Sequence, residues 1–372
     1  MTQRSVRYGA PGGRDGVFAR HPRELTAEWA RRVVALSRPG AVVSACDVVS
    51  VDVGTTTRVR IAVEHDAPDF PRRWFAKLPS LAWRARWITA LPRLPQAEAR
   101  FYRDVAARLP VRYPAALAGQ IVPGRGATVV LGDVTERGAR AGSTGDALSA
   151  EEAAGMVDEV ARLHASMWEH PALERELAWL AGPVRRTEDR LGAALALPLM
   201  RRGLRLAVDA VPESLREPAL AFAARRRAWM RFLADGPRTL VHHDLHPGNL
   251  FWRADGPGLL DWHLVRVGEG AGDLAYFLAT SLLPETRREH GERLLARYRE
   301  VLSAHGVPEA ATASLAERVR AHLVYPFEAM IATLAVGGMM TPASNLELIR
   351  RTAAAAADTA AFEAAPWRGR RR

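Results

Sequence analysis

Three side chains between Val241 and Trp262 have the types and spacing that phosphoryl transfer needs. The stretch reads VHHDLHPGNLFWRADGPGLLDW and contains Asp244, Asn249 and Asp261. Amide and carboxylate oxygens are the ligands that a hard cation such as Mg²⁺ prefers. A further carboxylate close to such a cation can accept or orient the proton of an attacking hydroxyl group. The segment therefore predicts a metal-assisted transfer centre.

A β-hairpin is predicted between the two candidate metal ligands. The Asp-Gly dipeptide at 255–256 is a tight-turn signal, and an apolar run stands on each side of it. Pairing about this turn sets Leu250 roughly opposite Asp261. We therefore expect Asn249 and Asp261 to meet at the open end of the hairpin, where both can bind one cation.

The same spacing resembles a known family of enzymes. The pattern H-x-D-x-x-x-x-N from His242 to Asn249, followed by Asp261, is similar to the catalytic loop and metal-binding Asp of the protein-kinase-like fold. The residue pattern is most similar to that of the aminoglycoside phosphotransferase and choline kinase-like group of small-molecule kinases. Two residues depart from that pattern: His243 stands where Gly is usual, and His263 stands where an acidic or amide residue is common. Neither departure removes a group that the chemistry needs.

The resemblance implies an α+β architecture with two lobes. A small β-rich N-terminal lobe, residues 1–134, would bind the nucleotide, and a larger, mainly helical lobe, residues 135–372, would carry catalysis and acceptor binding. Residues 1–24 are polar and rich in Gly and Arg, so we expect a loose arm there. The backbone of Asp133 and Val134, after a predicted strand, is the hinge to which the family binds adenine.

Lys77 is the only lysine in the chain. Of the 52 basic residues the other 51 are arginine, because 52 minus 1 leaves 51. An ammonium group is a compact point charge and a guanidinium group is a wide planar fork, so the two are not interchangeable against closely spaced phosphates. Lys77 lies in an apolar run that reads WFAKL. We therefore expect Lys77 to lie on a strand and to bind the nucleotide phosphates.

A lysine in this role needs a carboxylate to orient it, and Glu98 is the candidate. Glu98 shares a helical face with Tyr102, Val105 and Leu109, at i, i+4, i+7 and i+11. A charged group on an otherwise apolar face is expected to point inward at a partner. The resemblance implies a Lys77–Glu98 ion pair. The alternative is that Glu98 lies in the first helical turn only because the helix dipole favours an acidic side chain there.

A turn between two predicted strands completes the candidate nucleotide site. The strands cover 49–53 and 58–63, and Gly54, Thr55 and Thr56 lie between them. Backbone N–H groups and threonine hydroxyls there could cover the nucleotide phosphates. The segment has one glycine and lacks G-x-G-x-x-G, so an ordinary hairpin turn is the alternative.

Composition narrows the class of protein. The chain has 372 residues, 48% of them hydrophobic, which is enough for a sizeable core and two lobes. No leader and no apolar run of about 20 residues is evident, and Cys46 is the only cysteine, so we expect a cytoplasmic protein without a membrane partner. The net charge of +11 comes mostly from dispersed arginines, which argues against nucleic acid as a partner. The oligomeric state stays open.

Together these residues predict an ATP- and Mg²⁺-dependent kinase that phosphorylates a hydroxyl of a small molecule such as an antibiotic or natural product. GTP is not excluded as the donor. Asp244 would handle the hydroxyl proton, with His242 supporting the loop, and Asp273 would brace that loop. A protein kinase and a non-catalytic nucleotide-binding pseudokinase are the alternatives. A zinc cluster of the histidines between His242 and His246 is a further alternative.

The acceptor itself is not named by the sequence. In the resembling family the helical insert before the catalytic loop helps to line the acceptor pocket. Residues 180–240 contain 12 Arg against 6 Asp or Glu. An ammonium group near guanidinium groups costs Coulomb energy. We therefore expect a neutral or anionic acceptor rather than a polycationic one.

Overall fold

The computed structural model describes residues 16–82 and 94–365, and the chain divides into two compact units. The N-terminal unit contains residues 1–141, 251–255 and 259–265. The C-terminal unit contains 142–250, 256–258 and 266–372. The first division thus follows residue 141, slightly later than the predicted 134. Two short segments around Asp261 return to the N-terminal unit, which a linear division of the sequence did not anticipate.

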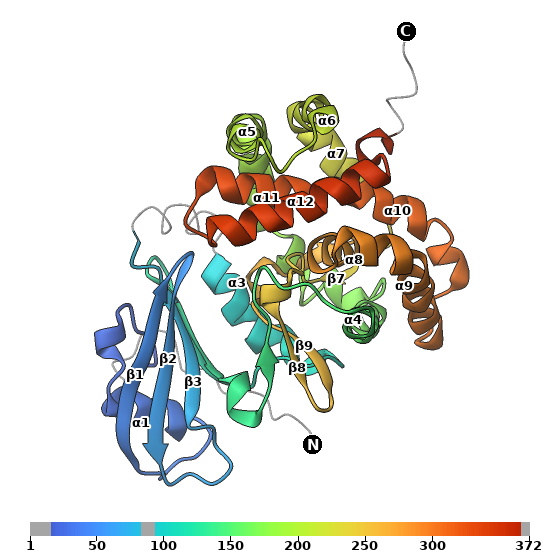
Figure 1. Cartoon of the computed structure of the whole chain (residues 1–372). Coiled ribbons are helices and arrows are strands. Elements are labelled where there is room, and N and C mark those ends of the chain that lie inside the picture. The colour runs from blue at the N-terminus through green and yellow to red at the C-terminus, as the bar shows by residue number, and fades with distance from the viewer. Residues whose placement is uncertain (1–15, 83–93, 366–372) are drawn as a thin grey trace. The chain divides into compact units, whose positions relative to one another are not determined.

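The N-terminal unit is built on a five-stranded antiparallel sheet with the order β1-β2-β3-β5-β4 (Figure 1). Its strands are β1 (Val43–Val53), β2 (Thr56–His65), β3 (Arg73–Pro79), β4 (Ala116–Val122) and β5 (Gly126–Gly132). Lys77 pairs with Arg58 on one side and with Val129 on the other. Lys77 therefore lies on the central strand of the sheet, where its backbone is held by two neighbours.

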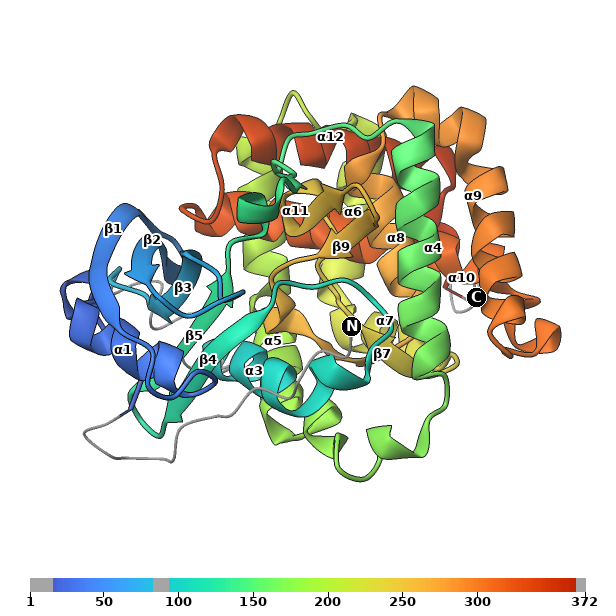
Figure 2. The ribbon, with the colours of Figure 1, turned by 90° about the horizontal axis from the view of Figure 1, so that it is seen from below.

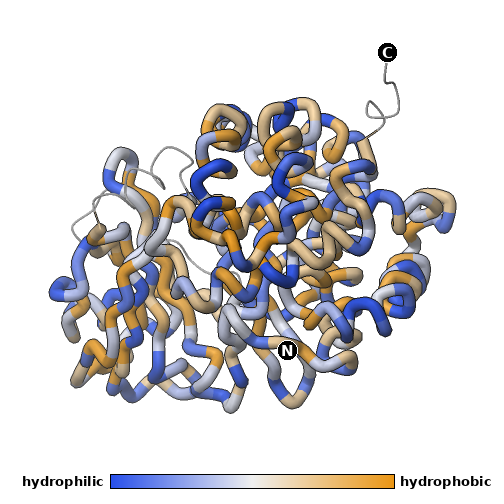
Figure 3. The backbone as a smooth tube through the Cα atoms, turned by 45° about the horizontal axis from the view of Figure 1, so that its top comes forward, coloured by the Kyte–Doolittle hydropathy of each residue, from blue (hydrophilic) through white to orange (hydrophobic). Residues whose placement is uncertain are grey.

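Alternating apolar residues give this sheet a buried face. Val59, Ile61 and Val63 of β2 are buried, whereas Arg60 and Glu64 between and beside them are exposed. Helix α1 (Ala27–Ala35) begins at the N-cap Thr26 and packs Trp29 and Val33 into the same core. Apolar and polar stretches alternate along the backbone of both units (Figure 3). In β2 the buried side chains recur at every second position, so they share one face of the sheet.

The described part of the predicted arm, residues 16–24, is ordered by contacts with the sheet. Val17 and Ala19 are buried. Ala19 N–H donates to Thr128 Oγ1 at 3.0 Å, and the indole N–H of Trp29 donates to the carbonyl of Val17 at 2.9 Å. The prediction of a loose arm is therefore wrong for 16–24, because alternate apolar side chains dock on the core. Residues 1–15 lie outside the described residues.

The helix that carries Glu98 is irregular. Helix α3 (Leu94–Arg100) continues as a single π turn over Phe101–Val105 and a 3₁₀ turn over Ala106–Arg108. Glu98, Tyr102, Val105 and Leu109 are nevertheless all buried, as their spacing predicted. A π turn inserts a residue into the helix, and such turns often lie next to functional sites.

The C-terminal unit is mainly helical. Its helices are α4 (Ala150–Ser166), α5 (Pro183–Leu206), α6 (Glu213–Ala224), α7 (Arg226–Leu233), α8 (Gly270–Ser281), α9 (Pro284–Ala304), α10 (Leu315–His322), α11 (Val324–Val336) and α12 (Pro342–Asp358). Helix α4 begins with a capping box, in which the Ser149 and Glu152 side chains each accept from the other residue's backbone N–H. Helices α4 and α9 pack side by side (Figure 2).

Short strands carry the segments with candidate chemistry. They are β6 (Arg140–Ala141), β7 (Thr239–Val241), β8 (Leu250–Arg253), β9 (Gly256–Leu259) and β10 (Arg266–Gly268). β7 pairs with β10, and β6, β8 and β9 form a small sheet. The hairpin turn is at 254–255, one residue earlier than predicted. Because β9 ends at Leu259, Asp261 lies beyond the strand, and the predicted pairing of Leu250 with Asp261 is wrong.

One helical stretch, Glu309–Val336, is long and apolar enough to cross a membrane by length and composition alone. Within its most apolar window, 61% is buried inside the protein. Burial of this kind is typical of a helix in the core of a folded domain. The stretch is therefore weak evidence for membrane insertion.

Candidate active site

Lys77 is the centre of a buried ion cluster in the N-terminal unit. Its Nζ donates to both carboxylate oxygens of Glu98, at 2.8 and 2.9 Å, and to Oδ1 of Asp261 at 2.7 Å. The side chains of Lys77 and Glu98 are 7% and 2% exposed. The predicted Lys77–Glu98 pair is confirmed. The contact with Asp261, 184 residues away in the chain, was not predicted from local pattern.

The charges of this cluster shift one another's pKa. Burial lowers the pKa of Lys77, but the carboxylates of Asp261 and Glu98 outweigh it, and the net direction is upward. Burial raises the pKa of Glu98, and the attraction of Lys77 offsets this only in part. Burial also opposes ionisation of Asp261, yet its interactions with His263 and Lys77 hold its pKa well below the ordinary value. Lys77 and Asp261 are therefore charged at neutral pH.

Asp261 is held in place by the two residues that follow it, Trp262 and His263. Its backbone is left-handed, with φ of 58°, and its Oδ1 contacts His263 Nδ1 at 2.6 Å. Trp262 is fully buried and stacks on Phe101, with ring centroids 4.1 Å apart and an interplanar angle of 9°. This stack ties Asp261 to the π turn that follows Glu98. The role of His263 was not predicted, although its departure from the family pattern was a signal.

The turn between β1 and β2 is anchored near the end of the Lys77 strand. Ser80 Oγ donates to the carbonyl of Gly54 at 2.7 Å, and Leu81 N–H donates to Thr57 Oγ1 at 2.9 Å. Thr55 completes this turn, and Thr56 is the first residue of β2. The turn is thus held by β3 and the residues after it, while its proposed contact with phosphates remains a prediction.

Asp133 has a structural task in the N-terminal unit. Its side chain pairs with Arg60 and caps the short turn Val134–Arg137 by accepting from Thr135 N–H at 2.9 Å. Its own backbone N–H donates to the carbonyl of Arg73 at 2.9 Å. That N–H is therefore engaged within the unit. The backbone contact of Asp133 and Val134 with adenine that the resemblance implied remains a prediction.

The candidate catalytic carboxylate, Asp244, is held by two partners in the C-terminal unit. Its Oδ1 accepts from the hydroxyl of Tyr276 at 2.8 Å, and its Oδ2 accepts from Asn249 Nδ2 at 3.0 Å. Asn249 Nδ2 also donates to the Asp244 carbonyl at 2.9 Å. Because the amide nitrogen faces the loop, the amide oxygen of Asn249 is the atom that can face a cation.

Burial, together with the nearby Asp244 carboxylate, raises the pKa of Tyr276 well above its ordinary value. The phenol therefore stays protonated and remains a donor to Asp244. Tyr276 was not among the predicted site residues. It lies on α8 three residues after Asp273, and this one-turn spacing was a usable signal.

A buried network braces the backbone of the candidate catalytic loop. The carboxylate of Asp273 accepts from the backbone N–H of His242 at 2.6 Å and of His243 at 2.7 Å. His164 approaches the same carboxylate at 3.2 Å and contacts Tyr298 Oη at 2.6 Å. The predicted brace by Asp273 is confirmed. His242 is fully buried, which suits loop support better than proton transfer.

His243 occupies a backbone conformation that favours glycine. Its φ is 71°, in the left-handed region that side chains rarely adopt. Its imidazole stacks on Tyr325, with ring centroids 4.4 Å apart and an interplanar angle of 24°. Burial, followed by the charge of Arg266, lowers the pKa of His243 well below its ordinary value. The positive φ at this position explains why the resembling family usually has Gly there. His243 adopts the same backbone conformation and adds a neutral ring.

The cation sites suggested by the sequence can be tested on donor chemistry. Among residues 16–82 and 94–365, no three His, Cys, Asp or Glu side chains are grouped to hold a metal ion. The alternative of a zinc cluster between His242 and His246 therefore has no support. Asn249 and Asp261 each offer a hard oxygen of the kind that binds Mg²⁺, which is commonly held by one or two protein ligands together with substrate phosphates.

The fold and the catalytic loop define a protein-kinase-like phosphotransferase. The model of the phosphotransferase enzyme family matches residues 54–321, and the chain belongs to that family. The activity of this family is phosphotransfer to small molecules. No curated protein sequence matches the chain.

Several solved structures are similar to this chain. One is aminoglycoside 2'-phosphotransferase-IIIa in its GDP complex, with 13% identity and a TM-score of 0.49, covering 87% of this chain and 96% of that one. A second is macrolide 2'-phosphotransferase MphH from Brachybacterium faecium, with 20% identity and a TM-score of 0.41, covering 90% and 98%. A third is choline kinase LicA from Streptococcus pneumoniae, with 14% identity and a TM-score of 0.43, covering 88% and 96%.

Proposed function

We propose that this protein transfers the γ-phosphate of ATP, or of GTP, to a hydroxyl group of a small molecule. The observation that carries the proposal is the buried pair of Lys77 and Glu98 together with Asp261, whose side chain is 26% exposed. One lysine between two carboxylates is costly to bury, so such a cluster suggests a task other than stability. Lys77 is the group that would bind the α and β phosphates, and Glu98 would orient it.

The cation has two candidate ligands in the chain. Asn249 would supply its amide oxygen and Asp261 its carboxylate. When bound, Mg²⁺ would neutralise charge on the nucleotide phosphates. His263 would fix the carboxylate of Asp261, with which it is in contact at 2.6 Å.

Asp244 would bind the acceptor hydroxyl and take its proton. The hydroxyl oxygen forms a bond to the γ-phosphorus while the bond from that phosphorus to the bridging oxygen of ADP breaks. The hydroxyl proton passes to a carboxylate oxygen of Asp244, and ADP leaves. Tyr276 and Asn249 keep that carboxylate in one orientation by their hydrogen bonds of 2.8 and 3.0 Å. Positioning of this kind supplies much of the catalysis in phosphoryl transfer.

Two alternatives are less well supported. A protein kinase would need an activation segment between Asp261 and the following helix. Here a 3₁₀ turn, β10 and the start of α8 at Gly270 take up that interval. A pseudokinase would tolerate loss of chemistry-bearing groups, whereas Lys77, Asp244 and Asn249 are all present and hydrogen-bonded.

The decisive variant is Asp244→Ala. We expect it to abolish transfer of phosphate to an acceptor while leaving nucleotide affinity within a few-fold, because Asp244 would contact the acceptor and not the nucleotide. Phosphate transfer is measured as a mass gain of one phosphate, and nucleotide affinity by titration calorimetry. Asp209→Ala, which removes an exposed carboxylate of the same unit, is the matched control.

Wild-type turnover in Asp244→Ala would show that Asp244 does not have the proposed role. Absence of both nucleotide binding and product in the wild-type protein would refute the function as a whole. The acceptor panel contains neutral, anionic and cationic alcohols, because the arginine excess of residues 180–240 favours a neutral or anionic one. Efficient turnover of a polycationic aminoglycoside, with neutral alcohols inert, would refute only the charge preference.

A further inference from the structure

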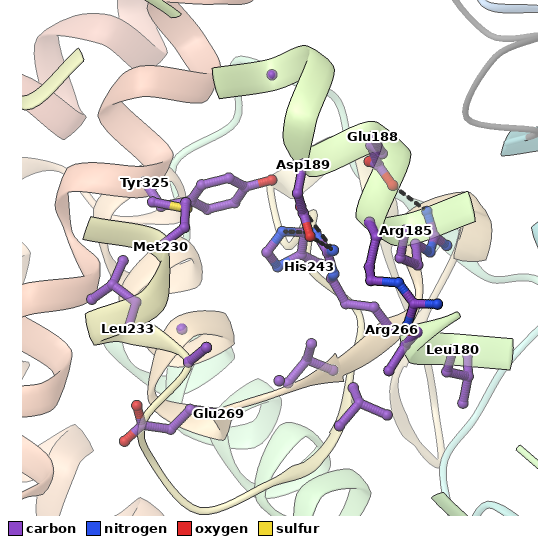
Figure 4. Close-up of a pocket in the computed structure, with 18 of the residues that line it drawn as sticks. Leu180, Arg185, Glu188, Asp189, Met230, Leu233, His243, Arg266, Glu269 and Tyr325 are labelled. Carbon is purple, nitrogen blue, oxygen red and sulfur yellow. Dashed lines mark hydrogen bonds and ion pairs between the residues drawn. The ribbon is translucent and has the colours of Figure 1, made fainter. Parts of the chain in front are cut away.

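The C-terminal unit contains a cavity of about 360 Å³ that includes the residue next to Asp244. Its wall includes residues of α5, α7, α8, α10 and α11, of the strands β7 and β10, and of the 3₁₀ turn Ala178–Ala181 (Figure 4). His243 and Tyr325 contribute aromatic surface, while Leu180, Met230 and Leu233 contribute apolar surface. A volume of this size is at the lower end of the range for small-molecule sites.

Most charged groups of this wall are paired within the protein, and the exposed Arg186 donates to the carbonyl of Ala181. Arg266 donates to both oxygens of Asp189 at 2.9 Å, as Figure 4 shows, and Arg185 donates to Glu188 at 2.8 Å. At the lower end of the wall, Glu269 accepts from His322 at 2.8 Å and from Arg318. A charged ligand would have to compete with one of these existing pairs.

Arg226, another guanidinium of the cavity wall, is also paired with a carboxylate of the protein. It donates to Glu328 at 2.6 Å, and the net effect of this partner raises the pKa of Arg226 despite burial. A carboxylate ligand gains most from an unpaired guanidinium, and an ammonium ligand gains most from an unpaired carboxylate. Because most charged groups of the cavity wall are already paired, the cavity favours a ligand that carries no charge and offers hydroxyl groups.

His243 gives this cavity a feature that the usual glycine would lack. Arg266 Nη1 lies 3.4 Å from His243 Nε2 and donates to it, which leaves the proton of the neutral imidazole on Nδ1. The ring is therefore a flat, uncharged group with one hydrogen-bond donor. Its backbone is strained at φ of 71°, and strain of this kind persists at sites where function compensates for it.

We propose that this cavity binds the acceptor and that His243, supported by Tyr325, selects an uncharged alcohol built on a ring. This inference rests on the proposed function, because Asp244 would act on the bound hydroxyl. The ring of the acceptor packs against the aromatic and apolar wall, and its polar groups bond to the imidazole and to the edges of the ion pairs. His243 is then a specificity residue rather than a spacer of the catalytic loop.

The test compares two variants of His243 with one control variant at another residue that has a positive φ. His243→Gly removes the ring and relaxes the strained backbone, so it is expected to fold. His243→Asn keeps a neutral donor and a residue type that tolerates the left-handed region. Asp69→Gly is the matched control, because Asp69 is exposed in the N-terminal unit and has a φ of 59°. The probes are uridine and phenyl β-glucoside as uncharged alcohols, D-glycerate as an anion, and choline and kanamycin as cations.

We expect the wild-type protein to bind and phosphorylate at least one uncharged probe. In His243→Gly the KM for that probe rises at least tenfold, while kcat and the KM for ATP stay within threefold. His243→Asn recovers part of the loss, and Asp69→Gly matches the wild type. If His243 had only a structural role, His243→Gly would change thermal stability. It would not raise the KM for the acceptor at constant kcat.

Three outcomes would overturn the inference. An unchanged acceptor KM in His243→Gly would show that the imidazole does not contact the acceptor. Turnover of choline, kanamycin or glycerate with the uncharged probes inert would refute the selected class while leaving the kinase function intact. Asp244-dependent ATP hydrolysis with no binding of any uncharged probe would refute the cavity assignment. Calorimetric binding of uridine or phenyl glucoside that His243→Gly weakens tenfold, without phosphate transfer, would instead support the cavity and refute the proposed function.

Discussion

Replacement of Lys77 by methionine removes the only cation between two carboxylates of the N-terminal unit. Lys77 Nζ lies 2.7 to 2.9 Å from three oxygens of Glu98 and Asp261. Loss of one partner from a buried ion pair typically costs about 3–5 kcal/mol of stability, because an uncompensated charge remains. We expect Lys77→Met to lose that amount at pH 8, where both carboxylates are ionised in the unfolded chain.

The loss should shrink as the pH falls. Burial already raises the pKa of Glu98, and removal of Lys77 takes away the attraction that opposes this shift. Glu98 of the folded variant therefore binds a proton at a higher pH than Glu98 of the unfolded chain. A group with a raised folded-state pKa stabilises the fold as the pH drops through that value, by up to about 1.4 kcal/mol per pH unit. Stability of Lys77→Met relative to wild type should thus improve between pH 8 and pH 5.5.

Urea unfolding followed by tryptophan fluorescence measures these differences, because Trp29 and Trp74 are buried in this unit. The double variant Lys77→Met/Glu98→Gln should recover about half of the loss at pH 8, since the neutral amide removes one buried charge. Arg58→Met is the matched control. Arg58 pairs with Lys77 in the sheet register but forms its ion pair with Asp52 at an exposed site, so its removal should have little effect. If Lys77→Met unfolded within about 1 kcal/mol of wild type at pH 8, the cluster would not have the assigned energetics.

Two further variants test the chemistry and the titration of the site. Lys77→Arg should lower kcat/KM by about 100-fold or more, because the wide guanidinium cannot reproduce the point contact with closely spaced phosphates; steady-state kinetics within twofold of wild type would show otherwise. His243→Gly should remove a pH dependence of stability. Because burial and Arg266 hold the pKa of His243 below its ordinary value of 6.5, the unfolded chain binds the extra proton and wild-type stability falls as the pH drops through about 6.5, with a slope of up to about 1.4 kcal/mol per pH unit. Unfolding free energies of both proteins between pH 8 and pH 5 would contradict this if their difference did not change.

Local patterns carried much of the prediction. The lone lysine in an apolar run identified Lys77, and one inward charge on an apolar helical face identified Glu98 as its partner. The spacing of Asp244 and Asn249 predicted a shared loop, and the two side chains are hydrogen-bonded. Each of these inferences needed only the periodicity of one element or the composition of the chain.

Contacts between distant segments could not be derived in the same way. Lys77 and Asp261 are separated by 184 residues, and no period or spacing links them. The return of residues 259–265 to the N-terminal unit depends on the stack of Trp262 on Phe101, which tertiary packing decides. The packing of 16–24 also required knowledge of the face that Val17 and Ala19 would meet. The one-residue error in the hairpin turn is of a different kind, since Gly256 has φ of 127° and begins β9 instead of occupying the turn.

Backbone strain and candidate chemistry coincide in this chain. Among the described residues, five that are not glycine have positive φ, and two of them are Asp261 and His243, the neighbour of Asp244. Each such residue costs about 1–3 kcal/mol and must be held by its surroundings. Asp261 is held by Lys77 and His263, and the backbone N–H of His243 is held by Asp273. Glycine at 243 would avoid that cost, so the histidine is explained by what its ring contacts and not by what the loop requires. Glycine at 261 would also avoid the strain, but it would remove the carboxylate that the proposed site needs.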